Sequence, residues 1–108
     1  MNYLLDTHIF LWAVADSPKL SSQVRSILKD GRNIIYVSAV TPWEISIKVS
    51  LGKLRIPNRP FQYELEVHRF TTLDINTEHA LEVQHLPLLH KDPFDRMLVA
   101  QAKAEKLK

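Results

Sequence analysis

The sequence predicts an α/β domain with three layers, in which helices cover both faces of a central parallel sheet. Two observations lead to this prediction. Short runs of β-branched and apolar residues alternate along the chain with longer helical patterns, and strands separated by helices pair in parallel through right-handed crossovers. The chain also has 108 residues, of which 45% are hydrophobic and 24% are charged. This composition suits a single domain, 1–108, with a core of its own.

The composition excludes several classes of function. The sequence has no cysteine, which removes disulfides, thiolate zinc sites and thiol nucleophiles. Its longest apolar run, at 9–15, is too short to span a bilayer, and its first residues lack the charged start of a signal peptide. We therefore expect a cytoplasmic protein without a membrane partner. The net charge of +2 and the sequence pI of about 9.0 permit a polyanionic partner without requiring one.

Three helices and two strands are predicted in the first half of the chain. The segment at 9–14 is apolar on almost every side, which is typical of a helix packed between a sheet and another layer. The β-branched run at 33–38 predicts a strand buried on both faces. Gly31 and Gly52 each follow a helical pattern and end it. The predicted elements are a strand at 2–5, helices at 9–14 and 21–30, a strand at 33–38 and a helix at 41–51.

A third strand and three further helices are predicted in the second half. Thr77 is a good helix cap, and Pro87 ends the helix that follows it. The loop at 53–60 carries basic residues, so it is either a polar connection or a segment that follows an RNA backbone. The predicted elements are a helix at 61–69, a strand at 70–75, a helix at 77–86, a link at 88–91 and a helix from 92 to about 107, and the basic loop residues are Lys53, Arg55 and Arg59.

Two of the predicted helix starts share one layout. In the last helix, Asp92 is a good N-cap, Pro93 suits the first helical position and Asp95 falls at the third. The segment TPWE at 41–44 repeats the order of a cap, a proline, an aromatic residue and an acid, which predicts Glu44 in the first turn of its helix. Taken singly, each motif is more often a helix start than an active site, since an acid there gains about 0.3–1 kcal/mol from the helix dipole.

Three acids are nevertheless candidates for one shared site. Asp6 follows the first strand, and all of Asp6, Glu44 and Asp95 should converge at the carboxyl edge of the sheet, where such folds bind ligands. Two carboxylates about 4 Å apart repel by roughly 4 kcal/mol at an effective dielectric of 20, which exceeds the gain from capping. A Mg²⁺ or Mn²⁺ ion would offset this repulsion and favour phosphodiester hydrolysis. Asp6 by itself is equally a helix cap.

Other residues near these acids have simpler explanations. Lys48 lies one helical turn after the second acid and is placed for an ion pair along the helix. Arg96 either contacts phosphate or is solvated. Of the five histidines, only His90, beside the third acid, is a candidate for a functional role, although a surface role is expected for it. Trp12 and Trp43 lie on apolar faces and are predicted to be core residues, with Trp43 also placed to line the acidic site.

Three segments together resemble a known family. They are LLDTH at 4–8, SAVTPWEI at 38–45 and HKDPFDRMLVAQA at 90–102. In order and spacing they look like the successive signatures of the PIN domain, and they are most similar to the VapC-like toxin ribonucleases of bacterial toxin–antitoxin pairs. The resemblance covers the entire chain, and its third segment is fairly specific.

The resemblance implies a function and a set of residues. It implies that Asp6, Glu44 and Asp95 are the metal-binding acids of an endoribonuclease that uses Mg²⁺ or Mn²⁺. By the same resemblance Thr7 helps to hold the site by hydrogen bonding, and Asp92 lies close to the metal ligands as the cap of the last helix. An RNA substrate and a cognate antitoxin protein are the implied partners.

The sequence departs from the family after the last helix. Family members usually continue into another strand and a fourth acid, whereas this chain stops at residue 108. The resemblance thus implies a PIN-like domain that lacks its C-terminal strand or strands, with a weak or absent second metal ion. The first strand, at 2–5, would then be an exposed apolar edge. We therefore expect a homodimer, with strand exchange as one form of it.

Two other classes of function remain open from the residues alone. The chain is alternatively a PIN-like module that binds an antitoxin or RNA with little or no catalysis. A phosphotransfer domain is a weaker third candidate, since Asp6 ends a first strand as it does in receiver-like folds. The second carboxylate of such a site is replaced here by His8. Metal-dependent RNA cleavage separates the first hypothesis from both alternatives.

Overall fold

A three-stranded parallel sheet lies at the centre of the molecule. The structure is a computed structural model, and it describes residues 1–55, 59–87 and 92–108. In the described residues the strand order is β1-β2-β3, with both pairs parallel. This confirms the predicted α/β class and the parallel pairing. The strands are β1 (Asn2–Leu5), β2 (Ile34–Ser38) and β3 (Thr71–Leu73).

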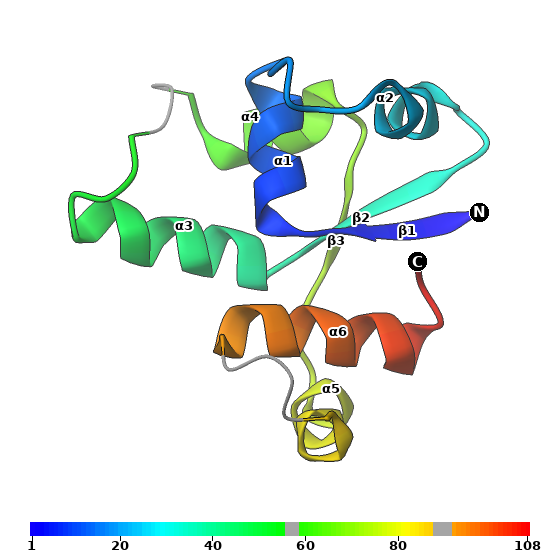
Figure 1. Cartoon of the computed structure of the whole chain (residues 1–108), viewed down its shortest axis with the longest axis vertical. Coiled ribbons are helices and arrows are strands. Elements are labelled where there is room, and N and C mark those ends of the chain that lie inside the picture. Colours follow the sequence, from blue (N-terminus) through cyan, green and yellow to red (C-terminus); the bar gives the residue numbers. More distant parts are fainter. Residues whose placement is uncertain (56–58, 88–91) are drawn as a thin grey trace.

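Helices cover both faces of this sheet, which confirms the predicted three-layer arrangement. Helices α1, α2 and α4 lie on one side, and α5 and α6 lie on the other (Figure 1). Helix α3 extends away from the sheet beyond the carboxyl ends of β1 and β2 (Figure 1). The helices are α1 (Thr7–Val14), α2 (Ser22–Lys29), α3 (Val40–Ser50), α4 (Phe61–Val67), α5 (Thr77–Glu82), the 3₁₀ helix η1 (Val83–His85) and α6 (Pro93–Glu105).

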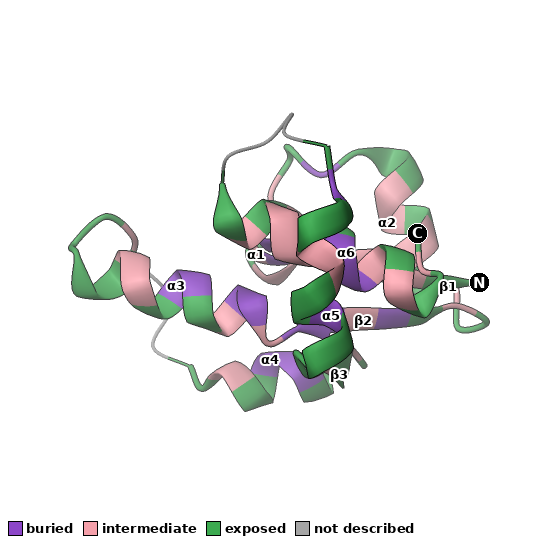
Figure 2. Ribbon diagram, turned by 90° about the horizontal axis from the view of Figure 1, so that it is seen from below, coloured by how far each residue is buried: buried purple, intermediate pink, exposed green. Residues whose placement is uncertain are grey.

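The core forms around β2, the middle strand. Ile35 and Val37 are buried, as expected of a β-branched strand covered on both faces. Buried residues line the inner sides of the helices that flank the strand (Figure 2). One hydrophobic cluster joins β1, β2, α1, α3 and α4, and its buried members are Leu5, Phe10, Ile35, Val37, Ile45 and Leu65.

Most element boundaries agree with the sequence prediction to within one or two residues, and the larger differences lie in the segment from β3 to η1. The predicted strand at 70–75 is shorter, because β3 pairs only with the last three residues of β2, Tyr36–Ser38. The predicted helix at 77–86 divides into α5 and the tighter η1. Asn76 rather than Thr77 caps α5, since the Asn76 side chain accepts a hydrogen bond from the backbone N–H of His79. The link at 88–91, which includes His90, lies outside the described residues.

The end of the chain passes beside the first strand. The backbone N–H of Lys108 donates to the carbonyl of Asn2 at 3.2 Å, and the two termini are neighbours in Figure 1. This contact lies on the side of β1 away from β2. No helix in the described part of the chain is both long enough and apolar enough to cross a bilayer.

Candidate functional site

Asp6 is held at the carboxyl end of β1 by the helix that follows it. It is the N-cap of α1, and its Oδ1 accepts a hydrogen bond from the backbone N–H of Ile9 at 2.8 Å. The capping role predicted for this acid is therefore confirmed. The side chain remains exposed, so the cap fixes the carboxylate at the sheet edge while solvent still reaches it.

The start of α3 differs from the prediction. Thr41 is not the N-cap; the cap is Ala39, which makes no side-chain capping bond, and no acid lies in the first turn. The prediction that Thr41 caps this helix and that Glu44 lies in its first turn was therefore wrong. Glu44 does not gain the dipole stabilisation of a first turn. The physical reason is Ser38, whose Oγ accepts the backbone N–H of Val40 at 3.0 Å and so satisfies the first donor of the helix from within β2.

Thr41 instead faces the start of α1. Its Oγ1 lies 3.4 Å from the Oγ1 of Thr7, and both side chains are buried. Thr7 and Thr41 thus join the beginnings of the two helices that carry Asp6 and Glu44. The hydrogen bonding expected of Thr7 is present, with Thr41 as its partner.

Glu44 is a buried carboxylate paired with a lysine of its own helix. It is only 3% exposed, and its Oε2 lies 2.6 Å from the Nζ of Lys48. This confirms the ion pair predicted between these residues. A buried carboxylate is costly without a counter-charge, so Lys48 offsets the cost of placing Glu44 inside.

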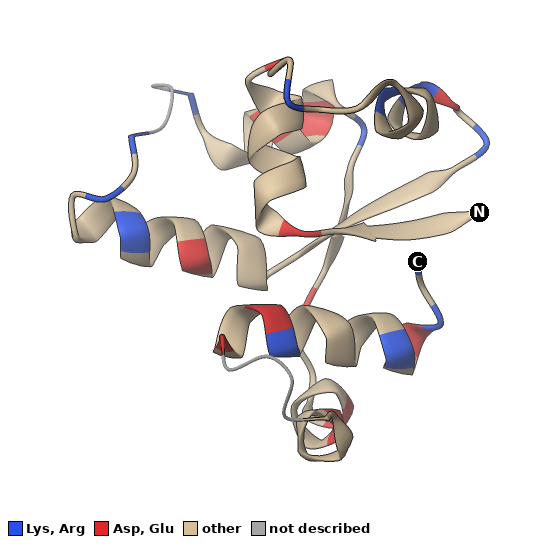
Figure 3. Ribbon diagram, viewed as in Figure 1, with Lys and Arg blue, Asp and Glu red and all other residues tan. Residues whose placement is uncertain are grey.

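The surroundings of Lys48 reveal where further negative charge lies. The hydrogen bond to Glu44 raises the pKa of the Lys48 ammonium, and the negative charges of Glu44, Asp92 and Asp95 raise it further, against the opposing effect of burial. Lys48 is therefore within electrostatic reach of acids from both α3 and the start of α6. Figure 3 shows acidic segments at the end of β1, on α3 and in the first turn of α6.

The start of α6 is as the sequence predicts. The Oδ1 of Asp92 accepts from the backbone N–H of Phe94 at 2.8 Å and of Asp95 at 3.4 Å, with Pro93 at the first helical position. Asp95 lies in the first turn. Asp92 is therefore the cap that orients this turn, as expected.

Arg96 has a structural role that the sequence analysis did not consider, and its predicted contact with phosphate stays a prediction. Its guanidinium donates to the backbone carbonyls of Val83 and Pro87, each at 3.0 Å. These contacts anchor the first turn of α6 to η1. Arg96 therefore positions the helix that carries Asp95.

Trp43 was predicted to be a core residue, and this was wrong. It is 50% exposed, because position 43 of α3 faces the start of α6 and solvent instead of the sheet. Its ring packs edge-on with Phe94, with ring centroids 4.8 Å apart and an interplanar angle of 82°. The two aromatic residues stand directly before Glu44 and Asp95 in the sequence.

A buried chain of polar side chains lies behind the acids, and sequence reasoning missed it. The hydroxyl of Ser38 donates to Oε1 of Gln101 at 2.5 Å, and Nε2 of Gln101 lies 3.4 Å from both Nδ1 of His79 and the carbonyl of Asp74. Nδ1 of His79 accepts the backbone N–H of Asn76, so the ring proton is on Nε2. That nitrogen is 2.8 Å from Oε2 of Glu105.

Gln101 thereby links α6 to the carboxyl ends of β2 and β3. The side chains of Ser38, Gln101 and His79 are each fully enclosed. The one sequence signal for Gln101 is its position one turn after Leu98, on the inner face of α6. A glutamine in that position is buried only if it finds partners.

The candidate acids fit a hard divalent cation in donor chemistry. All are carboxylates, the ligands that Mg²⁺ and Mn²⁺ prefer, and two of them, Glu44 and Asp95, stabilise the positive charge of Lys48 together with Asp92. Within residues 1–55, 59–87 and 92–108, however, no three His, Asp or Glu side chains lie close enough together to hold an ion as they stand. Glu44, Asp92 and Asp95 therefore act on one ammonium group in the described structure, and no ligand cage is closed there.

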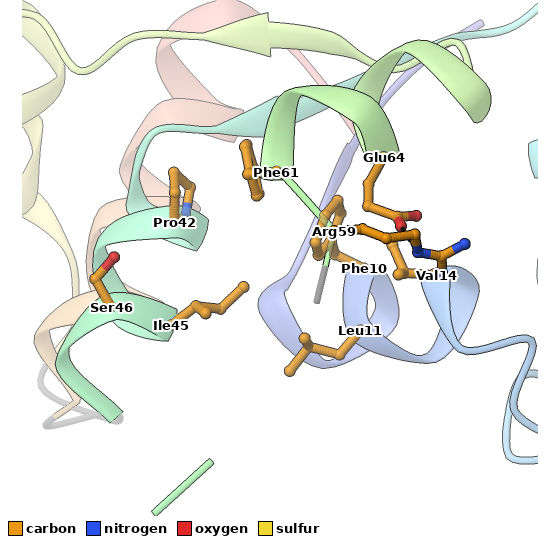
Figure 4. A pocket seen from close by; sticks show the side chains of 9 residues that line it. All are labelled: Phe10, Leu11, Val14, Pro42, Ile45, Ser46, Arg59, Phe61 and Glu64. Carbon is orange, nitrogen blue, oxygen red and sulfur yellow. Dashed lines mark ion pairs between the residues drawn. The ribbon is translucent and has the colours of Figure 1, made fainter. Parts of the chain in front are cut away.

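A separate apolar cavity of about 130 Å³ lies between α1, α3 and α4. In Figure 4 the side chains of Arg59 and Glu64 meet beside Phe10 and Val14. Nε of Arg59 is 2.8 Å from Oε1 of the buried Glu64, close enough for an ion pair although it is not aligned as a hydrogen bond. Arg59, one of the predicted basic loop residues, is therefore paired with a buried acid although its own side chain is 48% exposed, and the described lining includes none of the candidate acids.

The fold thus defines the class of protein as an α/β domain with a three-stranded parallel sheet, in which Asp6 caps the helix after β1 and Glu44 lies buried in α3. The family model of the PIN domain matches residues 3–108, and the chain belongs to the PIN domain family. This agrees with the resemblance in the three sequence segments.

Two relatives extend this result. The chain is similar to Ribonuclease VapC16 of Mycobacterium tuberculosis (strain ATCC 25618 / H37Rv), at 37% identity over 60 residues, which are 55% of this chain and 43% of that relative. The match thus spans less than half of the relative's length. The crystal structure of VapBC2 from Rickettsia felis bound to a DNA fragment from their promoter is similar in fold, with a TM-score of 0.70 at 21% identity over 99% of this chain and 84% of that chain.

Proposed function

We propose that this chain is a Mg²⁺- or Mn²⁺-dependent endoribonuclease and the toxin component of a type II toxin–antitoxin pair. The observation that carries the proposal is the gathering of acids around one ammonium group, because Lys48 pairs with buried Glu44 and feels the charges of Asp92 and Asp95. Membership of the PIN family and similarity to a protein named as a ribonuclease support it.

In this proposal Asp6, Glu44 and Asp95 hold the metal ion. When bound, the ion would polarise a phosphoryl oxygen and lower the pKa of the attacking water. The helix caps contribute by restricting carboxylate rotation: Ile9 holds one oxygen of Asp6, and the Asp92 cap orders the turn that carries Asp95. The hydroxyl contact between Thr7 and Thr41 keeps the first two acids in register.

One observation favours the alternative of a PIN-like module that binds an antitoxin or RNA with little or no cleavage. In the described residues the acids do not form a group of three at ligand distance. Under the nuclease proposal, metal binding draws these side chains together. Under the alternative, the acids only make polar contacts with the bound partner.

RNA cleavage by the 108-residue chain separates these functions. The assay compares cleavage of single-stranded RNA in Mn²⁺, in Mg²⁺ and in EDTA. Cleavage should require a divalent ion, and Asp6→Asn and Glu44→Gln should reduce it to the level seen in EDTA. Asp16→Asn, an exposed acid paired with Arg25 outside this region, is the matched control and should cleave normally. Cleavage that persists in Asp6→Asn would sink the nuclease proposal.

The partners follow from the same proposal. The substrate is RNA, and a cognate antitoxin protein would inhibit cleavage. An arginine of the antitoxin inserted among the acids would compete with metal and substrate, because guanidinium groups pair with carboxylates in a bidentate way. Such inhibition should weaken when Glu44 is replaced by glutamine.

We also propose a homodimer, with strand exchange along β1 as one form of it, in the cytoplasm. β1 lies at one edge of the described sheet, and only its other side pairs with β2. Backbone groups on such an edge favour pairing with a second chain. Light scattering checks this: a strictly monomeric species at micromolar concentration would count against the dimer.

A further inference from the structure

Lys48 has hydrogen-bonding capacity that its ion pair does not use. Its Nζ donates to Oε2 of Glu44 at 2.6 Å. An ammonium group carries three N–H donors, and in the part of the chain that the structure describes the other two have no hydrogen-bond partner. The side chain is also 40% exposed, so a ligand can approach it from solvent.

The ammonium group lies among negative charges from two helices. The hydrogen bond to Glu44 raises the pKa of Lys48, and the charges of Glu44, Asp92 and Asp95 act in the same direction. Lys48 is therefore protonated at neutral pH and brings a full positive charge to the region that carries two of the three proposed metal ligands.

The balance of charge there explains why an anionic substrate would need this lysine. Three carboxylates act on Lys48, and Asp6 adds a fourth in the proposed ligand set. One divalent ion offsets only two of these negative charges. A phosphodiester is itself an anion, so without Lys48 it would approach a site with a larger excess of negative charge.

Two other basic residues that were considered for contacts with RNA have partners elsewhere in the fold. The guanidinium of Arg96 donates to the carbonyls of Val83 and Pro87. Arg59 pairs with buried Glu64, beside a cavity whose described lining includes none of the candidate acids. Lys48 differs from both, because its one described partner is itself a candidate metal ligand.

We infer that Lys48 binds a phosphate of the RNA while it stays paired with Glu44, through a donor that the pair leaves over. An ammonium group forms charge-assisted hydrogen bonds with phosphate oxygens. Such a contact carries no sequence information, so Lys48 would hold the RNA backbone beside the acids whatever the base. The inference rests on the proposed function, because it names the residue through which that site holds its substrate.

Two binding measurements test the contact, and neither needs cleavage. Electron paramagnetic resonance gives the affinity for Mn²⁺, and the anisotropy of a fluorescein-labelled single-stranded RNA gives the affinity for RNA in Mn²⁺, with electrophoresis to check that the RNA is intact. Lys48→Met should bind Mn²⁺ about 3- to 10-fold more tightly, because it removes a charge that repels the ion. It should bind RNA about 3- to 20-fold more weakly, because it loses a partly exposed charge-assisted hydrogen bond.

These opposite changes separate a phosphate contact from a purely structural lysine. If Lys48→Met binds both Mn²⁺ and RNA more weakly, Lys48 only supports Glu44 and the inference is overturned. RNA binding equal to that of the wild type overturns it as well. Lys48→Arg keeps the charge and spare donors and should retain most of the RNA affinity. Lys19→Met removes the same charge at an exposed position before α2 and is the matched control, which should change neither affinity.

A scan of the RNA with single methylphosphonates identifies the partner of Lys48, because each substitution removes the charge of one phosphate. In the wild type, one position should cost more affinity than its neighbours. The same substitution should cost clearly less in Lys48→Met, where the contact is already lost. Equal penalties in the two proteins at every position would contradict the inference. Circular dichroism checks that each variant is folded.

These outcomes are separable from those of the nuclease test. If the wild type fails to cleave RNA but the penalty at one phosphate depends on Lys48, the contact stands and the nuclease proposal falls. If the wild type cleaves RNA in a metal-dependent way and Lys48→Met binds RNA equally well, the contact falls and the nuclease proposal stands.

Discussion

The hydroxyl of Ser38, the last residue of β2, donates to the side-chain carbonyl of Gln101 in α6 at 2.5 Å. The same oxygen of Ser38 accepts the first free N–H of α3, from Val40. One hydroxyl group therefore joins the helix that carries Glu44 to the helix that carries Asp95. No solvent reaches either side chain.

Ser38→Ala should destabilise the protein by about 1–3 kcal/mol, because it leaves a buried acceptor and a buried N–H without a partner. Urea unfolding measures the change. Ser26→Ala, on the exposed side of α2, is the control and should stay within about 0.5 kcal/mol of the wild type. Adding Gln101→Met to Ser38→Ala should cost less than the sum of the two single changes; strict additivity would contradict the coupling.

Lys48→Met should lower the melting temperature in EDTA, because it removes the counter-charge of buried Glu44. Since Lys48 is itself partly exposed, we expect a loss on the order of 1–3 kcal/mol. A cation bound at the acids would restore the missing charge, so Mn²⁺ should raise the melting temperature more in this variant than in the wild type. Lys53→Met, an exposed position, is the control. An equal Mn²⁺ shift in both proteins would argue against a cation beside Glu44.

The two roles of Asp6 should separate by substitution. Asparagine is as good an N-cap as aspartate, so Asp6→Asn should keep the wild-type stability, whereas Asp6→Ala should lose about 0.5–2 kcal/mol. Both should lose metal-dependent cleavage. Ser21→Ala removes the equivalent cap of α2, in which Oγ accepts from Val24 at 3.2 Å. Ser21→Ala should therefore lose stability as Asp6→Ala does, but it should cleave RNA normally.

Removing one partner of the ion pair between Arg59 and Glu64 should destabilise the protein more than replacing both partners. Among the described residues, Arg59→Met leaves Glu64 with the longer contact to His68 at 3.4 Å, and we expect a loss of about 1–3 kcal/mol after allowing for the exposure of Arg59. Replacing both partners by methionine should be closer to neutral. Arg55→Met is the exposed control, and urea unfolding measures all of these variants. A double variant that is less stable than Arg59→Met would contradict the prediction.

Stability in acid should depend on Asp30. Hydrogen bonds from the side chain and backbone of Arg32 lower the pKa of Asp30 from 3.8 to about 2. Because the pKa is lower in the folded state, this stabilisation is present above pH 3.8 and is lost as the pH falls toward 2. The stability difference between wild type and Asp30→Asn should therefore shrink between pH 5 and pH 2 in urea unfolding. Arg32→Met should give the same trend, and a constant difference would contradict it.

The fold was predictable because its signals are local. The β-branched run that forms β2 and the Asp92-Pro93 start of α6 each specify an element from a few adjacent residues. The start of α3 could not be predicted in this way, because Ser38 of the preceding strand accepts the hydrogen bond from the first backbone N–H of the helix. Thr41 has the residue type of a cap, but its hydroxyl is used by Thr7, which lies 34 positions away.

The features missed in the site depend on contacts between distant segments. Ser38 and Gln101 are 63 positions apart, and no periodicity relates them. Trp43 has an apolar side chain, but its exposure is decided by how α6 passes the end of α3. The convergence of Asp6, Glu44 and Asp95 stays a prediction from the carboxyl edge of a parallel sheet, because the closing of a ligand cage depends on side-chain rotation that no sequence pattern encodes.

The pairing of Glu44 with a lysine on its own helix has a consequence for the proposed binding of a metal ion. Proteins whose ligands have no internal counter-charge often need the ion in order to fold. Here the one buried candidate ligand is neutralised within a single helical turn. Under the proposed function, folding and metal binding would then be separate events, and the supply of Mg²⁺ or Mn²⁺ would govern whether an already folded chain is active.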